Sequence, residues 1–367
     1  MFDKADSGSA TAAGVDAIVL VGGQGTRLRP LTLSAPKPML PTAGLPFLTH
    51  LLSRIKSAGI DHVILGTSYQ SEVFSSYFGD GAELGLELEY VHEDVPLGTG
   101  GAIGNVAHLL RGDTAMIFNG DILTGCDLRA VLDHHRRVGA DVTLHLTKVD
   151  DPRAFGCVPT DADNRVQAFL EKDPNPVTDQ INAGTYVFAR SVVEAIPTGR
   201  PVSVERETFP QLLASGALVS AYIDATYWRD LGNPSDFVAG SADLVRGIAP
   251  SAALAGRTGE ALILDGAQLA GDARVFGGST VGKDCVVGHG AVIESSVLFD
   301  GAKVAPGATI RSSIIGRNAV VGANTSLCDV VIGDGAVLGS GIELLNGARV
   351  WPDVTLTDGS VRFSADA

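Results

Sequence analysis

The sequence predicts two domains: an α/β domain with a mixed, mainly parallel sheet, followed by a β-helix built from hexapeptide repeats. Three observations support this fold class. Strand-like and helix-like segments alternate from residue 15 to about residue 245, which is typical of parallel sheets covered by helices. A glycine-rich stretch follows the first apolar run. From Ile263 onward an aliphatic residue recurs every five or six positions, which indicates a solenoid.

Size and charge narrow the possible functions. The chain has 367 residues, enough for two separate cores, and 45% of them are hydrophobic. Its net charge of −15 argues against sequence-independent nucleic-acid binding, which needs a basic face. Because this charge repels an anionic substrate on average, a site for one must contain Arg, Lys or metal ions.

The cysteine spacing and the N-terminal residues indicate in which cellular compartment we expect the protein. The four cysteines (Cys126, Cys157, Cys285 and Cys328) show no C-x-x-C spacing, so reduced thiols in a cytoplasmic protein are favoured over zinc ligands. Residues 1–14 are small, polar and acidic, so we expect a disordered tail and no signal peptide. We expect no membrane span, because no apolar run is long enough.

The α/β elements follow in order. Strands are predicted at 17–21, 61–66, 86–91, 115–118, 141–149, 166–171, 184–189 and 218–223, and helices at 46–58, 70–78, 101–110, 203–215 and 234–246. In such sheets ligands bind beyond the carboxyl ends of the strands. Residues Gly22–Gly25 and Asp121 each come just after a strand. The later, more antiparallel strands are expected to form a lid over that crevice.

The stretch Gly22–Pro38 is suited to phosphate chemistry. It lacks the Lys-Ser or Lys-Thr of a Walker loop, and Leu28 replaces the third glycine of a dinucleotide fingerprint. Instead it carries Arg27, and Lys37 stands between Pro36 and Pro38. Glycines allow a backbone to approach phosphates closely, and two cations suit a triphosphate that reacts.

This stretch, G-x-G-T-R-L-x-P-L-T followed by P-K-P, resembles the signature of nucleoside-diphosphate-sugar pyrophosphorylases, also called sugar-phosphate nucleotidyltransferases. The resemblance implies a Rossmann-like nucleotidyltransferase domain in which a sugar 1-phosphate attacks the α-phosphorus of a nucleoside triphosphate. It implies that Arg27 contacts the β- and γ-phosphates and that Lys37 contacts the α-phosphate region. The implied nucleotide-binding residues of this part are Leu20, Gly22, Gly23, Gly25, Thr26, Arg27 and Lys37.

Two aspartates occupy motifs in which the family holds its metal. Asp121 stands in F-N-G-D and Asp230 in Y-W-R-D-L-G. The resemblance implies that both hold Mg²⁺ between triphosphate and sugar phosphate, where the ion acts as an orienting Lewis acid. The expected catalytic residues are therefore Arg27, Lys37, Asp121, Lys172 and Asp230.

Three further motifs resemble those that contact the sugar phosphate. Phe169–Lys172 resembles F-x-E-K, which implies that Glu171 accepts sugar hydroxyls and that Lys172 contacts the phosphate. Asn182 opens N-A-G, and Phe155-Gly156 matches an aromatic-glycine dipeptide that lies over the sugar. The expected sugar-phosphate-binding residues are Asn119, Gly120, Gly156, Glu171, Lys172 and Asn182.

The base is expected near Glu93–Gly101, which resembles the family's P-x-G loop, with Glu93, Pro96, Gly98 and Thr99 as contacts. Many relatives have Gln where this chain has Glu93. A carboxylate can accept both N1–H and the 2-amino group of guanine. With P-L-G-T and S-V-E-R-E-x-F-P (Ser203–Pro210), the chain is most similar to members that make GDP-mannose from GTP and mannose 1-phosphate.

Two alternatives remain. The same chemistry could use glucose 1-phosphate with UTP, dTTP or ATP. A catalytically silent regulatory subunit that binds nucleotide sugar is the second, and the presence of Arg27, Lys37, Asp121 and Asp230 favours an active enzyme over it.

The C-terminal repeat has a six-six-five period. Val281, Leu298, Ile315 and Ile332 are each 17 residues apart, and the pattern resembles that of left-handed β-helices. The flat faces and coil ends of such a domain suggest a homo-oligomer. We expect a tail at 1–14, the nucleotidyltransferase domain at 15–246, a linker at 247–260 and the β-helix at 261–363. His134 and His135 are expected on a helix surface, and His289 in a β-helix turn.

Overall fold

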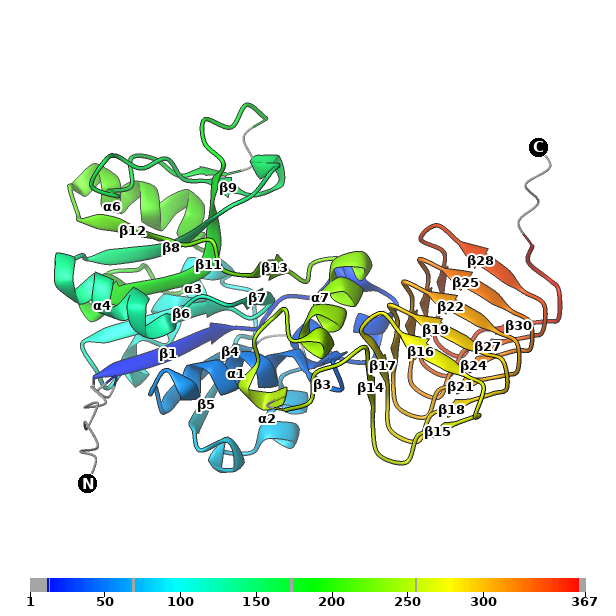
Figure 1. The fold of residues 1–367 in the computed structure, drawn as a ribbon. Coiled ribbons are helices and arrows are strands. Elements are labelled where there is room, and N and C mark those ends of the chain that lie inside the picture. Colours follow the sequence, from blue (N-terminus) through cyan, green and yellow to red (C-terminus); the bar gives the residue numbers. More distant parts are fainter. Residues whose placement is uncertain (1–11, 13, 68–69, 172–173, 255, 363–367) are drawn as a thin grey trace, which may run out of the picture. The chain divides into compact units, whose positions relative to one another are not determined.

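The computed structural model describes residues 12, 14–67, 70–171, 174–254 and 256–362 (Figure 1). The chain forms two compact units. Unit 1 comprises residues 1–22, 52–120 and 126–226, and unit 2 comprises residues 23–51, 121–125 and 227–367. The predicted tail falls almost wholly outside the described residues, and the predicted domain boundaries stay a prediction.

Unit 1 is built on a nine-stranded mixed sheet. Its main path runs β10-β9-β11-β6-β1-β4-β5, and β8 joins β11 to β12 (Figure 1). Parallel pairing joins β6, β1, β4 and β5, whereas β11 runs antiparallel to both β6 and β8. The strands are β1 (Val15–Leu20), β4 (His62–Thr67), β5 (Glu87–His92), β6 (Thr114–Asn119), β8 (Val142–Lys148), β9 (Gly156–Cys157), β10 (Leu170–Glu171), β11 (Gln180–Ala189) and β12 (Val219–Ile223). The predicted mixed, mainly parallel α/β sheet is confirmed.

The central strands carry apolar runs in their middle because both faces of the sheet are covered. Their buried side chains, such as Ile18, Ile64 and Ile117, join one core that also includes Tyr186 and Phe209. The rings of Tyr186 and Phe209 meet edge to face with centroids 5.4 Å apart. The helices are α1 (Phe47–Ser57, which runs from unit 2 into unit 1), α2 (Ser71–Phe78), α3 (Gly98–Asn105), α4 (Leu128–Val138), α5 (Arg190–Glu194) and α6 (Phe209–Ser215).

In unit 2 a short ribbon and one helix precede the β-helix. The ribbon pairs β7 (Ile122–Thr124) with β13 (Trp228–Asp230) in antiparallel register, and β2 (Pro41–Thr42) pairs with β3 (Leu45–Pro46). Helix α7 (Pro234–Arg246) begins where Asn233 accepts a hydrogen bond from the Asp236 N–H, and it ends at Gly247 with φ +74°. These end signals explain why the predicted bounds 234–246 match the structure.

The C-terminal strands stack in three parallel sheets, as the predicted left-handed β-helix requires (Figure 1). The first contains β14 (Ala261–Ile263), β17 (Ser279–Val281), β20 (Val297–Leu298), β23 (Ile314–Ile315), β26 (Val331–Ile332) and β29 (Arg349–Val350). The second contains β15 (Gln268–Leu269), β18 (Val286–Val287), β21 (Lys303–Val304), β24 (Val320–Val321), β27 (Val337–Leu338) and β30 (Thr355–Leu356). The third contains β16 (Arg274–Phe276), β19 (Val292–Glu294), β22 (Thr309–Arg311), β25 (Ser326–Cys328) and β28 (Glu343–Leu345).

Two kinds of ladder hold the coils together. Val281, Leu298, Ile315 and Ile332 are in register on successive strands and fully or almost fully buried. Beside them runs a serine ladder that the repeat analysis did not include. The Oγ atoms of Ser279, Ser296 and Ser313 each accept the backbone N–H 17 residues further on, at 3.1 Å. These bonds satisfy backbone donors that the narrow interior buries.

Three sequence-based expectations are wrong. Residues 166–171 do not form one strand, because the segment changes partner: Val166 makes an isolated bridge to Thr160, and Leu170–Glu171 pairs with β9. His134 and His135 are buried rather than exposed, since Ser220 and Thr143 supply hydroxyl partners at 2.8 and 2.9 Å. Ile263, the first aliphatic residue of the repeat, is expected in the β-helix interior like the others, but it is 41% exposed because no earlier coil covers the first strand.

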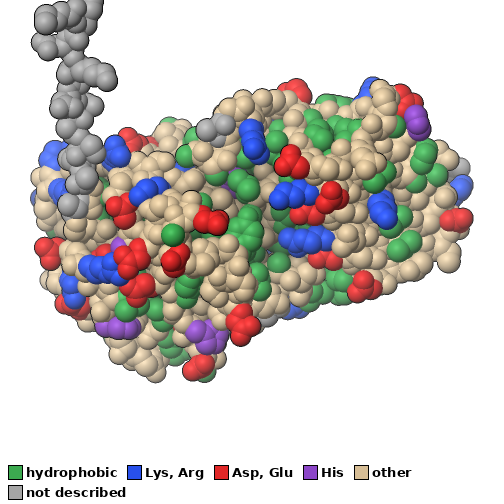
Figure 2. Space-filling view, turned by 90° about the horizontal axis from the view of Figure 1, so that it is seen from below, with side chains coloured by type: hydrophobic (Ala, Val, Ile, Leu, Met, Phe, Trp, Pro, Cys, Tyr) green, Lys and Arg blue, Asp and Glu red, His purple; other side chains and the backbone are tan. Residues whose placement is uncertain are grey.

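On the face drawn in Figure 2, Lys and Arg side chains lie beside Asp and Glu side chains and do not gather in a single patch. Among the described residues no helix is both long and apolar enough to cross a lipid bilayer.

Candidate active site

The signature loop of unit 2 folds closely on itself around Gly25. This glycine has φ +58°, and a Cβ on it would stand 2.9 Å from Thr32 Cγ2 and 3.0 Å from Lys37 Cβ. The Thr32 hydroxyl donates to the Gly25 carbonyl at 3.0 Å, and the Leu28 N–H donates to the same carbonyl. Only glycine fits a left-handed conformation this close to other atoms. The motif therefore brings Thr26 and Arg27, which follow Gly25, close to Lys37.

Three predicted residues form one charged cluster in unit 2. Lys37 Nζ lies 2.8 Å from Asp121 Oδ2 and 3.6 Å from Asp230 Oδ1. The ribbon explains the position of the aspartates, because Asp121 directly precedes β7 and Asp230 pairs with Ile122 across it. The side chain of Lys37 is 11% exposed, so its ammonium is largely withdrawn from bulk water. The structure thus brings together charges that are far apart in the sequence.

Arg27 joins this cluster over Gly232. A Cβ at Gly232 would stand 2.6 Å from Arg27 Nη2 and 3.1 Å from Asp230 Oδ1. The missing side chain leaves space for the guanidinium beside the carboxylate. Sequence reasoning did not identify this glycine, although its position two residues after Asp230 in Y-W-R-D-L-G was a usable signal.

Arg229 fixes the ribbon on α7 and was also missed. It donates to Asp236 at 3.0 Å and pairs with Asp243 at 3.3 Å, both on α7. Because side chains alternate along a strand, Arg229 points away from the face that carries Asp230. This alternation was the signal that could have separated a positioning arginine from the charged cluster.

The cluster is suited to a divalent cation. Burial raises the pKa of Asp230, the charge of Asp121 raises it further, and Lys37 and Arg27 act in the opposite direction. Asp230 Oδ1 is buried, and no described residue hydrogen-bonds to it, since Lys37 is at ion-pair distance only. A buried carboxylate oxygen without a hydrogen bond, next to a second carboxylate, is a donor set that hard cations favour.

At the sheet edge of unit 1 the structure places three predicted residues together. Leu20 and Asn119 are register partners on β1 and β6, and Gly120 N donates to the Leu20 carbonyl at 3.0 Å. A Cβ at Gly120 would stand 2.7 Å from that oxygen, so glycine is required here. Gly22 ends unit 1 two residues beyond β1, and Gly23 begins unit 2.

The predicted base loop is anchored within unit 1. Glu93 accepts the Leu97 N–H at 3.1 Å and so closes the turn that contains Pro96. Gly98, with φ +70°, begins α3, and a Cβ on it would stand 2.6 Å from the Val202 carbonyl oxygen.

Thr99 adds a second anchor to the base loop. It donates to Glu205 and accepts the Val204 N–H, both at 2.9 Å. The two motifs that suggested GDP-mannose synthesis, P-L-G-T and S-V-E-R-E, are therefore in direct contact.

Three of the predicted sugar-phosphate residues lie on the neighbouring strands β9, β10 and β11. Gly156 and Glu171 are register partners, and Asn182 lies on β11 at a bulge. The Asn182 side chain accepts the Gly184 N–H at 3.0 Å and donates to the Tyr186 hydroxyl at 2.7 Å. Lys172 lies outside the described residues.

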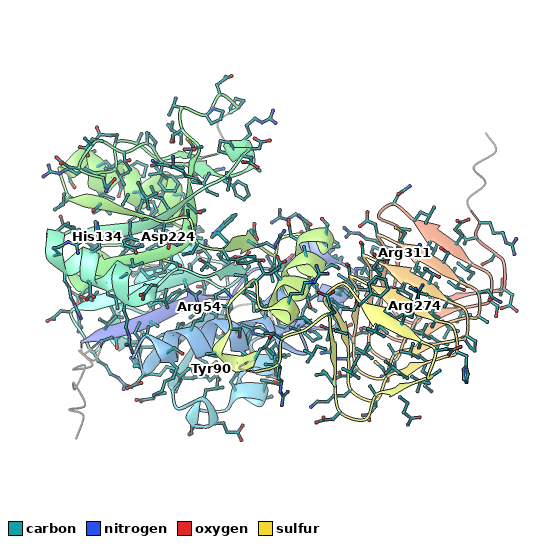
Figure 3. The ribbon with its side chains drawn as sticks, in the orientation of Figure 1. Arg54, Tyr90, His134, Asp224, Arg274 and Arg311 are labelled. Carbon is teal, nitrogen blue, oxygen red and sulfur yellow. The ribbon has the colours of Figure 1, made fainter. Side chains whose placement is uncertain are left out.

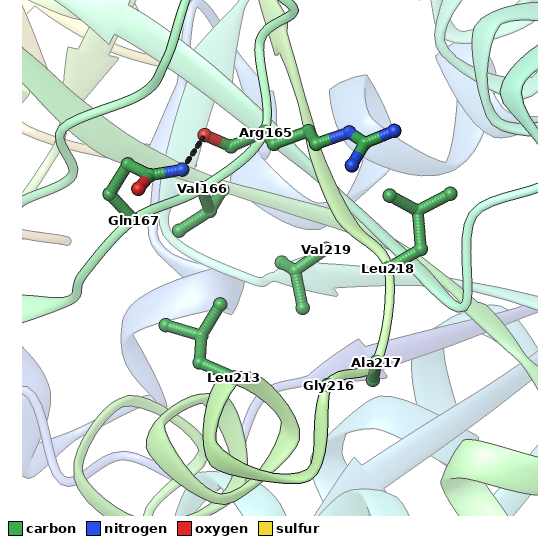
Figure 4. A pocket seen from close by; sticks show the side chains of 8 residues that line it. All are labelled: Arg165, Val166, Gln167, Leu213, Gly216, Ala217, Leu218 and Val219. Atoms are coloured by element: carbon green, nitrogen blue, oxygen red, sulfur yellow. Dashed lines mark hydrogen bonds between the residues drawn. The ribbon is translucent and has the colours of Figure 1, made fainter.

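A cavity of about 410 Å³ in unit 1 contains none of the predicted residues (Figure 4). It lies at the start of β12, a strand parallel to β8, and both run in the direction of β6 because each of β6 and β8 is antiparallel to β11. The cavity therefore lies at the amino ends of these strands, opposite to the end of the sheet where β1 and β6 have their carboxyl ends. Its lining includes Val166, Leu213 and Val219, with Arg165 and Gln167 beside them.

Comparison with known families decides the class of protein. Residues 16–247 match the family described as nucleotidyl transferase. The chain belongs to the nucleotidyl transferase family. Residues 257–362 match a second family, described as the GMPPB C-terminal domain. The prediction of a nucleotidyltransferase enzyme with a Rossmann-like domain and a C-terminal β-helix is confirmed.

Individual relatives of this nucleotidyltransferase agree. It is 66% identical over 353 residues to a mannose-1-phosphate guanylyltransferase of Mycobacterium tuberculosis, covering 96% of this chain and 98% of that one. It is 34% identical to mannose-1-phosphate guanylyltransferase 1 of Arabidopsis thaliana, covering 77% and 78% of the two chains. Among solved structures it is similar to HddC from Yersinia pseudotuberculosis complexed with GMP-PN, with 28% identity and a TM-score of 0.55, covering 62% of this chain and 99% of that one.

Proposed function

We propose that this nucleotidyltransferase transfers GMP from GTP to mannose 1-phosphate, forming GDP-mannose and pyrophosphate. The observation that carries the reaction type is the cluster in which Lys37 and Arg27 lie beside Asp121 and Asp230. The choice of substrates is supported by the name of the relative that is 66% identical over nearly the full length.

The residues of the cluster act on charge. A phosphate oxygen of the sugar 1-phosphate forms a bond to the α-phosphorus, and the bond from that phosphorus to the bridging oxygen of pyrophosphate breaks. Both reactants are anions, and two unit charges about 4 Å apart interact by about 4 kcal/mol at an effective dielectric of about 20. Arg27 and Lys37 therefore lower the barrier, because they lie where the two anionic reactants come together and where the anionic pyrophosphate departs.

Asp121 and Asp230 would hold a divalent cation, which we propose is Mg²⁺. When bound, such an ion supplies Lewis-acid orientation of the phosphate oxygens. Lys37 keeps the two carboxylates close together by pairing with both. Lys172 is proposed to contact the sugar phosphate next to Glu171.

Glu93 is proposed to select guanine. Its Oε2 accepts the Leu97 N–H, so the loop that contains Pro96 fixes the direction of the carboxylate. We predict that Glu93→Gln lowers the ratio of kcat/KM for GTP to kcat/KM for ATP by about tenfold, since one acceptor for guanine becomes a donor.

Steady-state kinetics with both nucleotides measure this ratio. Glu87→Gln, which changes an exposed glutamate of β5, is the matched control. An unchanged ratio in the Glu93 variant would remove the guanine role.

A matrix of nucleoside triphosphates against sugar 1-phosphates, read by pyrophosphate release, tests the whole proposal. GTP with mannose 1-phosphate should react fastest. A faster reaction of glucose 1-phosphate with UTP, dTTP or ATP would replace the proposed substrates. Nucleotide-sugar binding without any reaction would indicate the regulatory subunit.

We further propose a cytoplasmic homo-oligomer with a nucleotidyltransferase domain at 15–246, a linker at 247–260 and a β-helix at 261–363. Support comes from the four cysteines, which form no disulfide with one another, and from the flat sheets of the β-helix. Light scattering of the purified chain measures the oligomeric state.

A further inference from the structure

Three side chains that the proposed reaction does not use converge inside unit 1. Cys126 precedes α4, and His145 lies within β8. Asp224, which is labelled in Figure 3, directly follows β12. The Cys126 thiol sulfur, one ring nitrogen of His145 and one carboxylate oxygen of Asp224 lie within 4.8 Å of one another. Cys126 and His145 are buried, and the Asp224 side chain is 14% exposed. The three residues come from three separate segments, so no spacing motif in the sequence predicts that they lie together.

His145 is the unusual member of this cluster. It is fully buried, and neither ring nitrogen has a hydrogen-bond partner among the described residues. Nε2 lies 3.4 Å from Asp224 Oδ1, close enough for an ion pair but outside hydrogen-bond geometry. Leaving a buried polar group unsatisfied costs stability, so a buried ring without a partner requires an explanation.

Other buried histidines of the chain are satisfied. His50 has Ser251 Oγ at 2.8 Å from one ring nitrogen and the Thr42 carbonyl at 2.9 Å from the other. His134 and His135 each have a hydroxyl partner. The fold therefore supplies partners to buried imidazoles elsewhere, and the exception at His145 stands next to a thiol and a carboxylate.

We propose that Cys126, His145 and Asp224 bind one zinc-like transition-metal ion. Thiolate, imidazole and carboxylate are the ligand types that Zn²⁺ takes, at about 2.0–2.3 Å. Mg²⁺ prefers oxygen ligands, so this cluster differs in kind from Asp121 and Asp230. Coordination gives a ring nitrogen of His145 the partner that it lacks.

The charges around the cluster suit such an ion. The carboxylates of Asp127 and Asp224 and the guanidinium of Arg54 are the charged groups that act on it. With the thiol protonated they leave one net negative charge. A divalent ion that replaces the thiol proton adds one positive charge and makes the group neutral.

Neighbouring residues already orient two of the ligands. Arg54 donates to the Cys126 carbonyl at 2.6 Å, and Asp224 Oδ1 accepts from the Thr226 N–H and hydroxyl at 3.0 and 2.9 Å. Figure 3 labels both Arg54 and Asp224. Groups that orient metal ligands in this way strengthen binding.

Short segments of the chain connect the proposed metal site to the ribbon of β7 and β13. Cys126 comes two residues after β7, and Asp224 comes four residues before β13. These strands lead to Asp121 and Asp230. An ion that joins Cys126 to Asp224 would tie together the segments that leave and enter the ribbon.

Titration of the chelator-treated, full-length chain with CoCl₂ in excess Mg²⁺ tests the site. We expect a thiolate-to-Co²⁺ charge-transfer band that saturates at one ion per chain, which oxygen ligands alone cannot produce. Cys126→Ser and His145→Gln should abolish the band or weaken binding at least tenfold. Cys285→Ser, which changes a buried thiol of the β-helix, should leave it intact. No band in the unmodified chain, or an unchanged band in Cys126→Ser, would overturn the site.

A second measurement does not depend on whether the variants fold. X-ray absorption of the unmodified chain loaded with ZnCl₂ should show one sulfur ligand, and a shell of only nitrogen and oxygen would contradict the proposal. Asp121→Asn separates this site from the proposed reaction, because it should reduce pyrophosphate release and leave the Co²⁺ band unchanged.

Discussion

The β-helix and the charged cluster of unit 2 are stabilised in opposite ways. In the β-helix each interior side chain stacks on its equivalent one coil away, as Leu298 does on Val281 and Ile315. In the cluster Lys37 pairs with Asp121, which is 84 residues away in the sequence, and the contacting side chains differ in type and charge. Repetition spreads stability over many similar contacts. The cluster concentrates charge at one place, where it can act on a substrate, and so a single change there should affect chemistry more than folding.

Asp230→Asn should produce the largest effect and break the cluster alone. We expect kcat to fall by about 10³-fold, near the upper end for loss of one preorganised electrostatic group. The free energy of unfolding should not fall, because a buried carboxylate with a raised pKa becomes neutral.

Pyrophosphate release and urea unfolding measure the two quantities. Asp61→Asn, at an exposed ion pair with Lys56, is the control that should keep full activity. Activity within twofold of the unmodified chain in Asp230→Asn would contradict the proposed role.

Leu327→Ala should give the converse result in the β-helix. Leu327 is fully buried, and truncation should cost about 3 kcal/mol of unfolding free energy through the cavity that it leaves. The kcat of the folded fraction should stay unchanged.

Urea unfolding and kinetics on the same sample separate these effects. Lys303→Ala, on an exposed position of β21, should change stability by less than about 0.5 kcal/mol. A loss of kcat in Leu327→Ala that matches its loss of stability would show that the two regions are not independent.

Arg349→Ala tests a direct link between the two regions. Arg349 on β29 donates to the carbonyl of Arg29 in the signature loop at 2.6 Å. Loss of one hydrogen bond of about 1 kcal/mol should lower kcat/KM about fivefold, with less effect on stability.

Arg311→Ala is the matched control. Arg311 (Figure 3) lies in a different sheet of the β-helix from Arg349, and it pairs with Glu294 of its own sheet. Equal kinetics in both variants would mean that the β-helix does not position the loop.

A pH-dependent contribution outside both regions should be smaller. The hydrogen bond that the His62 ring donates to the Asp16 carboxylate raises the pKa of His62 above 6.5 against the effect of burial; Glu89 adds to the rise, and Arg111 opposes it. Protonated His62 is thus favoured in the folded chain. Its contribution is full below about pH 6.5 and is lost as the pH rises through the higher folded pKa.

The free energy of unfolding that His62 contributes, measured as the difference between the unmodified chain and His62→Gln, should therefore be smaller at about pH 8.5 than at about pH 6. The two chains are compared because burial lowers the pKa of His50 and His135 to about 4, so both of these groups favour the folded chain at the higher pH. An equal difference at the two pH values would contradict the role of His62.

The repeat could be predicted because its contacts lie at a fixed separation. Once the positions 17 residues apart are recognised, register and burial of Val281, Leu298 and Ile315 follow. Ile263 fails only because coverage by a neighbouring coil is not encoded in the residue itself. The serine ladder repeats at the same separation, but its hydroxyls bond to backbone, which residue type alone does not show.

The site could be predicted only in part. The motifs identified Arg27, Lys37, Asp121 and Asp230, but their meeting depends on how the ribbon pairs. The burial of His134 and His135 depends on hydroxyls that Ser220 and Thr143 supply from other strands.

Cys126, His145 and Asp224 show the same limit, since separate segments bring them together. The expectation from cysteine spacing disfavoured zinc, whereas our proposal rests on a histidine and an aspartate that spacing does not include.

The bonds between successive coils have a consequence for change in length. Between Ser279 and Val330 each serine hydroxyl bonds to the next coil at an interval of 17 residues. Duplication or loss of a whole coil there preserves this interval for all others. A single-residue deletion instead shifts each following residue by one position, so that the serine and aliphatic ladders on the two sides of the deletion no longer align. Natural variation in this part of the molecule should therefore come in whole-coil steps.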